Sequence, residues 1–313
     1  MKKLLNISSS PHLRHPDTTQ GIMLDVIIAL MPAAVFGCVV FGWRAAAVLL
    51  ISVLTAVLSE FLWNLICKKP QTVFDLSAVV TGLLLGMNLP SATPLWIAAV
   101  GSFVAIIIVK QLFGGLGHNF ANPAITARIV LLVSFPVHLT TFVSPLNVDT
   151  VSTATPLAYL SGSASEYVPS LKDLFFGVKA GCIGEISAFL LIIGGLYLVL
   201  RRVISPVTPI CFIGTVLMTS LIAGENVGVA VFGGGLMLGA IFMATDYATT
   251  PTTPLGKAVF GVGCGLITFV IRHFGSLPEG VSYSILIMNI LTPYINRLTE
   301  RKPFGFVKEG KQL

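Results

Sequence analysis

The stretch GLLLGMNLPSATPLW, residues 82–96, has a counterpart later in the chain, GLMLGAIFMATDYATTPTTPLGK, residues 235–257. Both copies begin with the pattern GLxLG, continue through small and polar residues, and reach the tripeptide TPL, whose two occurrences lie 160 residues apart. Further matches follow, because Gly101 corresponds to Gly261 and VKQLFGG corresponds to IRHFGS. The sequence therefore predicts an internal repeat that extends well beyond these two stretches.

The composition is that of an all-α integral membrane protein. Of the 313 residues, 55% are hydrophobic and 10% are charged, and the mean hydropathy is +0.91. A helix of about 20 apolar residues crosses a bilayer core about 30 Å thick. Eight runs have roughly this length: 22–42, 45–66, 95–113, 178–199, 204–223, 228–245, 255–273 and 281–296. Two shorter runs, at 76–89 and 125–135, bring the expected number of transmembrane helices to about ten.

The distribution of positive charge predicts the orientation. With the N-terminus in the cytoplasm, fourteen of the nineteen Lys and Arg residues fall on the inner side, as the positive-inside rule requires. The tails at 1–21 and 297–313 are then cytoplasmic, and the loop at 137–177 lies on the outer side of the cell membrane. The net charge of +6 is accounted for by topology, so it does not indicate a nucleic-acid partner.

Five predicted spans separate equivalent positions of the repeat, and an odd number inverts the second copy relative to the first. The expected architecture is therefore two inverted five-helix repeats, at 22–136 and 178–296. Inverted repeats commonly place short or broken helices at the centre, where their backbone groups line a binding cavity. The two short segments fit this role, because both combine Gly or Pro with hydroxyl residues at membrane depth.

Several charged residues fall within or at the ends of the apolar runs, where an unpaired charge is costly. They are Asp25, Glu60, Lys110, Arg128, Glu185, Asp246 and Arg272. Asp25 and Asp246 are candidates for an ion pathway because of their depth. Lys110 and Arg272 are expected at helix ends, where their long side chains can reach the interface.

Two polar stretches carry the candidate chemistry. GGLGHNFANPAITAR, residues 114–128, brings His, Asn, Thr and Arg to the start of a membrane segment. DTVSTATPL, residues 149–157, lies in the external loop. From its residues alone, the second stretch is either an ordinary turn capped by Asp149 and Ser152 or an attachment point for a modifying group, held extended before Pro156.

DTVSTATPL resembles the flavinylation motif of the membrane subunits of two related ion pumps, the Rnf ferredoxin:NAD oxidoreductase and the Na-translocating NADH:quinone oxidoreductase. The chain has Thr150 and Thr153 where the family more often has small residues. GGLGHNFANPAITAR also resembles a signature of this family, and the resemblance covers nearly the whole chain. The short N-terminal tail is more similar to the Rnf branch.

This resemblance implies covalent FMN, joined through its phosphate to Thr155, with Asp149 and Ser152 shaping the loop for a flavin transferase. It also implies a second, non-covalent flavin, riboflavin, within the membrane domain, near Asn119 and Asn122. Thr126 belongs to the same signature.

The implied fold is of the urea-transporter type, and the implied partners are Rnf subunits A, B, C, E and G, together with membrane lipid. The expected function is electron transfer between the external FMN and the riboflavin, as part of a redox-driven ion-translocating enzyme, with no complete activity in the isolated chain.

Two other functions remain open from the residues. A small-solute permease would also use an inverted repeat with broken helices, but it has no use for the external motif. A purely structural scaffold explains neither polar stretch. The five cysteines form no CxxC pair, so the chain alone offers no iron–sulfur site, although one cysteine could join a cluster shared with a partner. The sequence also leaves Na⁺ and H⁺ equally open as the transported ion.

Overall fold

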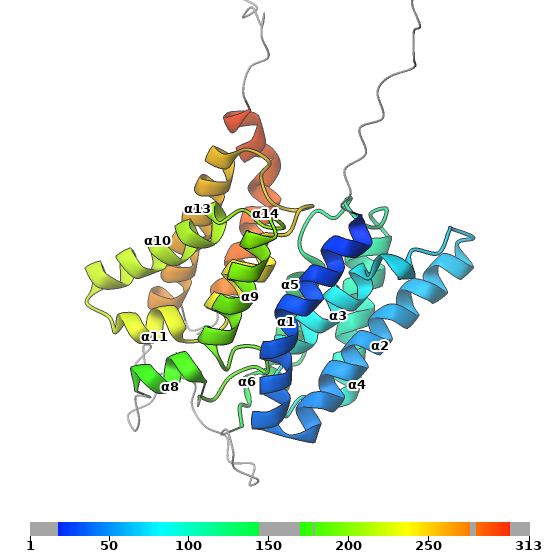
Figure 1. The fold of residues 1–313 in the computed structure, drawn as a ribbon, viewed down its shortest axis with the longest axis horizontal. Helices are drawn as coiled ribbons and strands as arrows, with labels where there is room; N and C mark the ends of the chain where they lie inside the picture. Colours follow the sequence, from blue (N-terminus) through cyan, green and yellow to red (C-terminus); the bar gives the residue numbers. More distant parts are fainter. Residues whose placement is uncertain (1–17, 144–169, 178, 276–279, 301–313) are drawn as a thin grey trace, which may run out of the picture.

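A computed structural model describes residues 18–143, 170–177, 179–275 and 280–300, which form helices joined by loops. In Figure 1 the helices of the first half of the chain lie together on one side, and those of the second half lie on the other. The first half contains α1 (Thr19–Phe41), α2 (Trp43–Ile66), η1 (Val73–Asp75), α3 (Ser77–Met87), α4 (Leu95–Phe103), η2 (Val104–Gln111), α5 (Pro123–Ser134) and α6 (Pro136–Thr140). The second half contains α8 (Leu171–Phe176), α9 (Ala188–Leu200), α10 (Val207–Ala223), α11 (Val227–Phe232), α12 (Leu236–Leu238), η3 (Gly239–Met243), α13 (Pro254–Phe274) and α14 (Gly280–Thr299).

The repeated tripeptide TPL marks the start of a helix in both halves. Leu95 begins α4 directly after Pro94, and Pro254 is the first residue of α13. Proline suits the first turn of a helix because the amide it lacks would have no partner there. In the second copy the hydroxyl of Thr253 also caps the helix by accepting a hydrogen bond from Gly256 N, at 3.0 Å.

The two halves meet along α1 and α9, and along α5 and α14. Glycines allow the first pair to approach closely. A Cβ atom on Gly194 of α9 would overlap the carbonyl oxygen of Ala29 on α1, and one on Gly37 would lie 2.5 Å from the carbonyl oxygen of Ile183. Small residues at such contacts are typical of helix packing in membranes.

Three helices within the described ranges, α1, α2 and α13, are each long and apolar enough to cross a bilayer. Large apolar side chains also lie exposed along the outside of the bundle, Val39 (71%), Ile66 (75%) and Ile222 (83%) among them. Such a surface is stable against lipid and unfavourable against water. These features are those of an integral membrane protein.

Two of the apolar runs are interrupted where the sequence predicts continuous helices. The run at 228–245 is divided, because α11 ends at Phe232 and the chain turns through Gly233, Gly234 and Gly235 before the short α12 and the π-helical η3. Gly234 has φ 61°, a conformation that glycine adopts readily and other residues do not. The run at 178–199 becomes helical only at Ala188.

Candidate functional site

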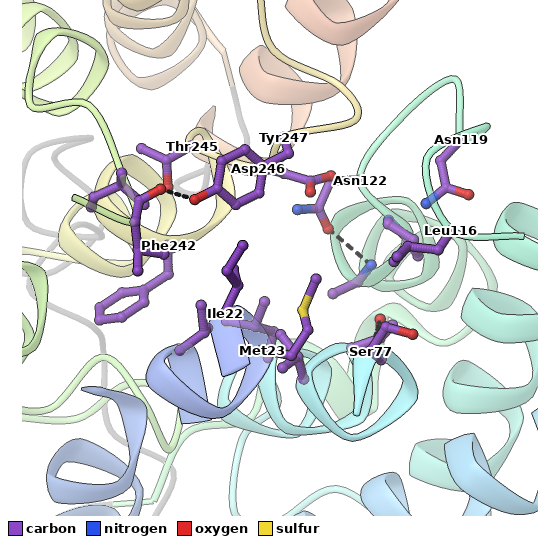
Figure 2. A pocket seen from close by; sticks show the side chains of 18 of the residues that line it. Ile22, Met23, Ser77, Leu116, Asn119, Asn122, Phe242, Thr245, Asp246 and Tyr247 are labelled. Atoms are coloured by element: carbon purple, nitrogen blue, oxygen red, sulfur yellow. Dashed lines mark hydrogen bonds between the residues drawn. The ribbon is translucent and has the colours of Figure 1, made fainter. Parts of the chain in front are cut away.

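The two halves enclose a pocket near the N-terminal ends of α1 and α3 (Figure 2). Its apolar wall includes Ile22 and Met23 from α1 and Phe242 from η3. The cavity volume is about 80 Å³. Its polar residues converge from several elements: Ser77, Thr81, Lys110, Asn119, Asn122, Thr245, Asp246 and Tyr247. A mostly apolar cavity with a few placed polar groups is typical of a small-molecule site.

The loop that carries Asn119 has an unusual backbone. Gly114, Gly115 and Gly117 have φ angles of 119°, 95° and 87°, in a region that residues with a Cβ atom rarely occupy. This explains the glycines of the GGLGHNF stretch, because they allow the chain to turn sharply between η2 and α5. The turn places the side chain of Asn119 at the pocket (Figure 2).

Asn119 has hydrogen-bonding capacity that the described chain does not use. Its side-chain oxygen Oδ1 is buried and has no hydrogen-bond partner there. A buried amide oxygen without a partner costs about 1–3 kcal/mol, and a polar ligand in the pocket would recover this free energy by donating to it once the Asn119 amide has rotated toward the cavity. Asn119 therefore fits a ligand with a hydrogen-bonding edge, as an isoalloxazine ring has.

Asn122 has a structural role beside its place at the pocket. Its Oδ1 caps α5 by accepting hydrogen bonds from Ala124 N and Ile125 N, at 3.0 and 3.4 Å. Its Nδ2 donates to the carbonyl oxygen of Met243 in the other half of the chain, at 3.2 Å. With the amide of Asn289 oriented to satisfy its neighbours, the backbone N–H of Asn122 donates to it at 3.1 Å.

Asp246 lines the pocket from the segment after η3 (Figure 2). Its Oδ2 accepts a hydrogen bond from the hydroxyl of Thr249 at 3.1 Å. The hydroxyls of Thr245 and Thr250 bond to backbone carbonyls one turn earlier, at 2.6 and 2.7 Å. The threonines therefore satisfy this irregular backbone, and one of them also bonds the carboxylate.

Lys110 is not at the interface, so the expectation that its side chain reaches outward is wrong. It is 1% exposed, and its ammonium group donates to both carboxylate oxygens of Glu60, at 3.0 and 2.9 Å, and to the hydroxyl of Ser77 at 2.6 Å. Glu60 also accepts from Thr72 and Gln111, at 2.7 and 3.0 Å. Of this buried, hydrogen-bonded ion pair, Lys110 lines the pocket together with Ser77.

The side chain of Arg272 is also buried, so the expectation that it reaches the membrane interface is wrong. It is 8% exposed, and its guanidinium donates to the carbonyl oxygen of Ala230 at 2.7 Å. Lys179 donates to the carbonyl oxygen of Phe232. Both side chains thus satisfy backbone oxygens left free where α11 ends, which a membrane interior requires.

Arg128 and Glu185 join the two halves away from the pocket. Arg128 Nη1 donates to Asn88 Oδ1 at 2.7 Å and lies 3.5 Å from Glu185 Oε1. Its Nη2 lies 3.4 Å from the sulfur of Cys182. Groups of His, Cys, Asp and Glu suited to a metal ion do not occur among the described residues.

The other predicted site residues are not gathered at the pocket. Asp25 forms an ion pair with Arg201 at 3.1 Å and accepts from Tyr197 at 2.8 Å, across the α1–α9 contact. The hydroxyl of Thr126 bonds to the carbonyl oxygen of Asn122 at 2.9 Å, within α5.

Three further predicted residues, Asp149, Ser152 and Thr155, lie outside the described residues. The structure therefore does not test their assignment to a flavin attachment site.

Comparison with known proteins gives one consistent result. A model of the NQR2, RnfD, RnfE family matches residues 6–305. The D subunit of the Na(+)-translocating ferredoxin:NAD(+) oxidoreductase complex of Acetobacterium woodii is 50% identical over 98% of both chains. The D subunit of the proton-translocating ferredoxin:NAD(+) oxidoreductase complex of Clostridium ljungdahlii is 42% identical over 97% of both. The D subunit of the ion-translocating oxidoreductase complex of Halorhodospira halophila is 33% identical, again over 97% of both.

Proposed function

The chain belongs to the NQR2, RnfD, RnfE family, and from that membership we propose that it is a flavin-bearing membrane subunit of a redox-driven, ion-translocating ferredoxin:NAD oxidoreductase. Its partners are then the other Rnf subunits, A, B, C, E and G. The chain supplies binding and orientation, and the flavins supply one- and two-electron redox chemistry. In isolation the subunit completes no reaction, because its flavins only pass electrons between partners.

The proposed route for electrons joins two flavins, FMN on Thr155 outside the membrane and riboflavin in the pocket between the halves. The single observation that supports the second site is the buried, unpartnered Oδ1 of Asn119 at a largely apolar cavity. The apolar wall suits a flat aromatic ring and excludes water from it. Asn119 would hold the polar edge of the ring, and Asn122 keeps the two walls together through Met243.

The covalent site is tested on a denaturing gel. The chain is produced with a flavin transferase in a host that exports the loop correctly, and the gel is viewed under ultraviolet light. We expect a fluorescent band that is absent from Thr155→Val and retained in Thr153→Val, which removes a neighbouring hydroxyl of the same loop. Correctly inserted chain without fluorescence, or fluorescence that survives Thr155→Val, would contradict the assignment.

The non-covalent site is tested by chromatography of the flavin that acid releases from the purified complex. Asn119→Ala is expected to lower the riboflavin content while the fluorescent band of Thr155 persists. Thr155→Val should do the reverse, so each variant is the control for the other. Unchanged riboflavin in Asn119→Ala would remove the pocket from the proposal and leave the covalent site intact.

For ion translocation we propose Asp246 and Asp25 as pathway residues. Asp246 is the stronger candidate because its carboxylate lines the pocket, whereas Asp25 is already paired with Arg201. The relatives include both a sodium-translocating and a proton-translocating complex, so the ion is tested directly. If the complex in proteoliposomes still moves Na⁺ and H⁺ normally after Asp246→Asn and Asp25→Asn, these residues are not on the path.

The proposed topology has about ten spans in two inverted five-helix repeats of the urea-transporter type, in the cell membrane, with both termini cytoplasmic. Equivalent helices pack alike, because α2 contacts α4 as α10 contacts α13. Labelling of single cysteines tests the orientation. Cysteine at Lys68 should react only from the cytoplasmic side, and cysteine at Arg44 only from the outside. The reverse pattern would contradict it.

A further inference from the structure

A second cavity lies beside the first and shares part of its wall, including Val203 and Thr245. It is formed where α9 ends, α10 begins and α13 begins, and its volume is about 340 Å³. Tyr247 separates the two cavities, because its hydroxyl donates to the carbonyl oxygen of Val203. The flavin proposal makes no use of this cavity.

The lining of the second cavity is basic and rich in hydroxyls. Arg202 and Lys257 both line it, together with Ser205, Thr208 and Thr250. The lining contains no carboxylate, and within the described ranges neither Arg202 nor Lys257 has an ion-pair or hydrogen-bond partner for its side chain.

Two acidic groups, one next to the lining in sequence and one paired with a residue next to it, have other partners. Asp246, next to Thr245 in sequence, lines the first cavity and bonds Thr249, and Asp25 pairs with Arg201. Two cations and the hydroxyls of Ser205 and Thr208 therefore face a cavity that supplies no negative charge of its own, whereas the hydroxyl of Thr250 already donates to the carbonyl oxygen of Asp246.

Arg202 occupies a backbone position that usually belongs to glycine. Its φ angle is 58°, and it follows the last turn of α9, with Arg202 N donating to Val199 O at 3.0 Å and Val203 N donating to Leu198 O at 2.9 Å. This pattern is a Schellman helix end, in which the left-handed residue is most often glycine. An arginine there costs about 1 kcal/mol of backbone free energy, and the attraction between its charge and the C-terminal end of the α9 dipole offsets part of that cost.

The N-terminal end of α10 adds to the positive electrostatic potential in the same cavity. The helix begins at Val207, directly after Ser205 and Pro206, and has 17 residues. Its N-terminus carries a partial positive charge that favours anions. Thr208, in this first turn, is 2% exposed and lines the cavity.

We propose that this cavity binds the phosphate group of a phosphate ester. Arginine and lysine pair with phosphate oxygens through charge-assisted hydrogen bonds, and the hydroxyls and the helix start complete the donor set. The cavity lies at the membrane face where the charge distribution places the cytoplasm. Basic pockets between helices on that side are where anionic phospholipid headgroups bind. We therefore expect an inner-leaflet phospholipid to supply the phosphate group. A soluble phosphate ester is the alternative that the test distinguishes.

The test uses the purified complex that contains the full chain. In the lipid arm, complexes are incubated with phosphatidylcholine vesicles with and without phosphatidylglycerol, and the anionic lipid that stays bound is counted by mass spectrometry. In the soluble arm, binding of inorganic phosphate and of glycerol 3-phosphate is measured by calorimetry. Removing one cation should lower the binding affinity for the anion roughly fivefold, and removing both cations should lower it roughly 25-fold.

The variants are Arg202→Gly, Lys257→Met and their combination. Arg202→Gly is informative because glycine suits the backbone there, so binding should fall while thermal stability is kept. Lys68→Gly is its matched control. Lys68 also has a left-handed backbone, with φ 51°, at the end of α2, and it is a cation predicted for the same membrane face that does not line the cavity.

Loss of anionic lipid in the two cavity variants, with Lys68→Gly unchanged, supports the site and assigns it to lipid. Loss of phosphate or glycerol 3-phosphate binding in the same variants, with no lipid effect, supports the site and assigns it to a soluble ester. If neither arm detects binding, or if Lys68→Gly loses as much as Arg202→Gly, the cavity is only a solvated basic surface and the proposal is wrong. The flavin content of these variants is a separate readout, so this result does not depend on the proposed function.

Discussion

The buried pair of Glu60 and Lys110 makes the sharpest prediction about stability. Their side chains are 1% and 2% exposed, and the ammonium group contacts both carboxylate oxygens at 3.0 and 2.9 Å. Glu60→Gln preserves the shape of the acid but leaves the ammonium group of Lys110 without a counter-charge. Breaking a buried pair from one side costs about 3–5 kcal/mol.

The reverse change should cost less. Lys110→Met leaves the carboxylate of Glu60 with two hydrogen-bond donors, Thr72 at 2.7 Å and Gln111 at 3.0 Å. We therefore expect the free energy of unfolding to fall by about 3 kcal/mol, the lower end of the range for a broken buried pair. Replacing both partners by methionine removes both buried charges together, and apolar replacement of a whole pair is often neutral or stabilising. The double variant should therefore be more stable than either single variant.

The assay is thermal unfolding of the purified chain in detergent, with the free energy taken from reversible denaturant titration. A loss of 3–5 kcal/mol corresponds to a Tm lowered by about 6–10 °C for a chain of this size. Two results would refute the reasoning. In the first, the unfolding free energy lost by the double variant equals the sum of the losses in the two single variants. In the second, each single variant loses only ~1 kcal/mol, as an exposed ion pair would.

Glycine substitutions at two helical positions should have opposite effects on the same unfolding assay. Gly194→Ala should lower the free energy of unfolding by about 1–3 kcal/mol, because the added Cβ would overlap the carbonyl oxygen of Ala29. Gly214→Ala should raise it by about 0.5–1 kcal/mol, because a Cβ there meets nothing within 4 Å and alanine favours the helix. Equal changes in the two variants would contradict the close α1–α9 contact at Gly194. Asn122→Ala should cost about 1–2 kcal/mol through loss of the helix cap and of the bond to Met243, and Asn122→Asp should recover the cap alone. If Asn122→Asp is no more stable than Asn122→Ala, the cap is not the main contribution.

Local signals in the sequence predict much of the fold. Runs of apolar residues locate most of the helices, and α4 and α13 both begin at the TPL tripeptide, because proline suits a helix start; in α13 alone the preceding threonine also caps the helix. The break in the run at 228–245 escapes this reasoning. VFGGGLMLG remains apolar throughout, and hydropathy does not distinguish a glycine that allows close packing from one that turns the chain.

Side-chain partners are harder to predict than helices. Lys110 meets Glu60, 50 residues away in the chain, and no local pattern indicates which buried charges will be neighbours. The resemblance of GGLGHNFANPA to a known signature predicts that Asn119 and Asn122 lie near a riboflavin; both residues line the same pocket, and the riboflavin itself stays a prediction. It does not predict that, of these two asparagines, Asn119 retains an unpartnered side-chain oxygen, whereas Oδ1 of Asn122 caps α5 by accepting hydrogen bonds from Ala124 N and Ile125 N.

The bond between Asn122 and Met243 also bears on how the protein is made. The first wall of the pocket leaves the ribosome early, with Ile22 and Met23, but the facing wall at 242–247 is synthesised more than 200 residues later. Until that segment has inserted, Nδ2 of Asn122 lacks the carbonyl oxygen of Met243 as its hydrogen-bond acceptor, and only one wall of the cavity is present. Any ligand that needs both walls of this pocket can therefore bind only late in biogenesis, after membrane insertion of nearly the entire chain.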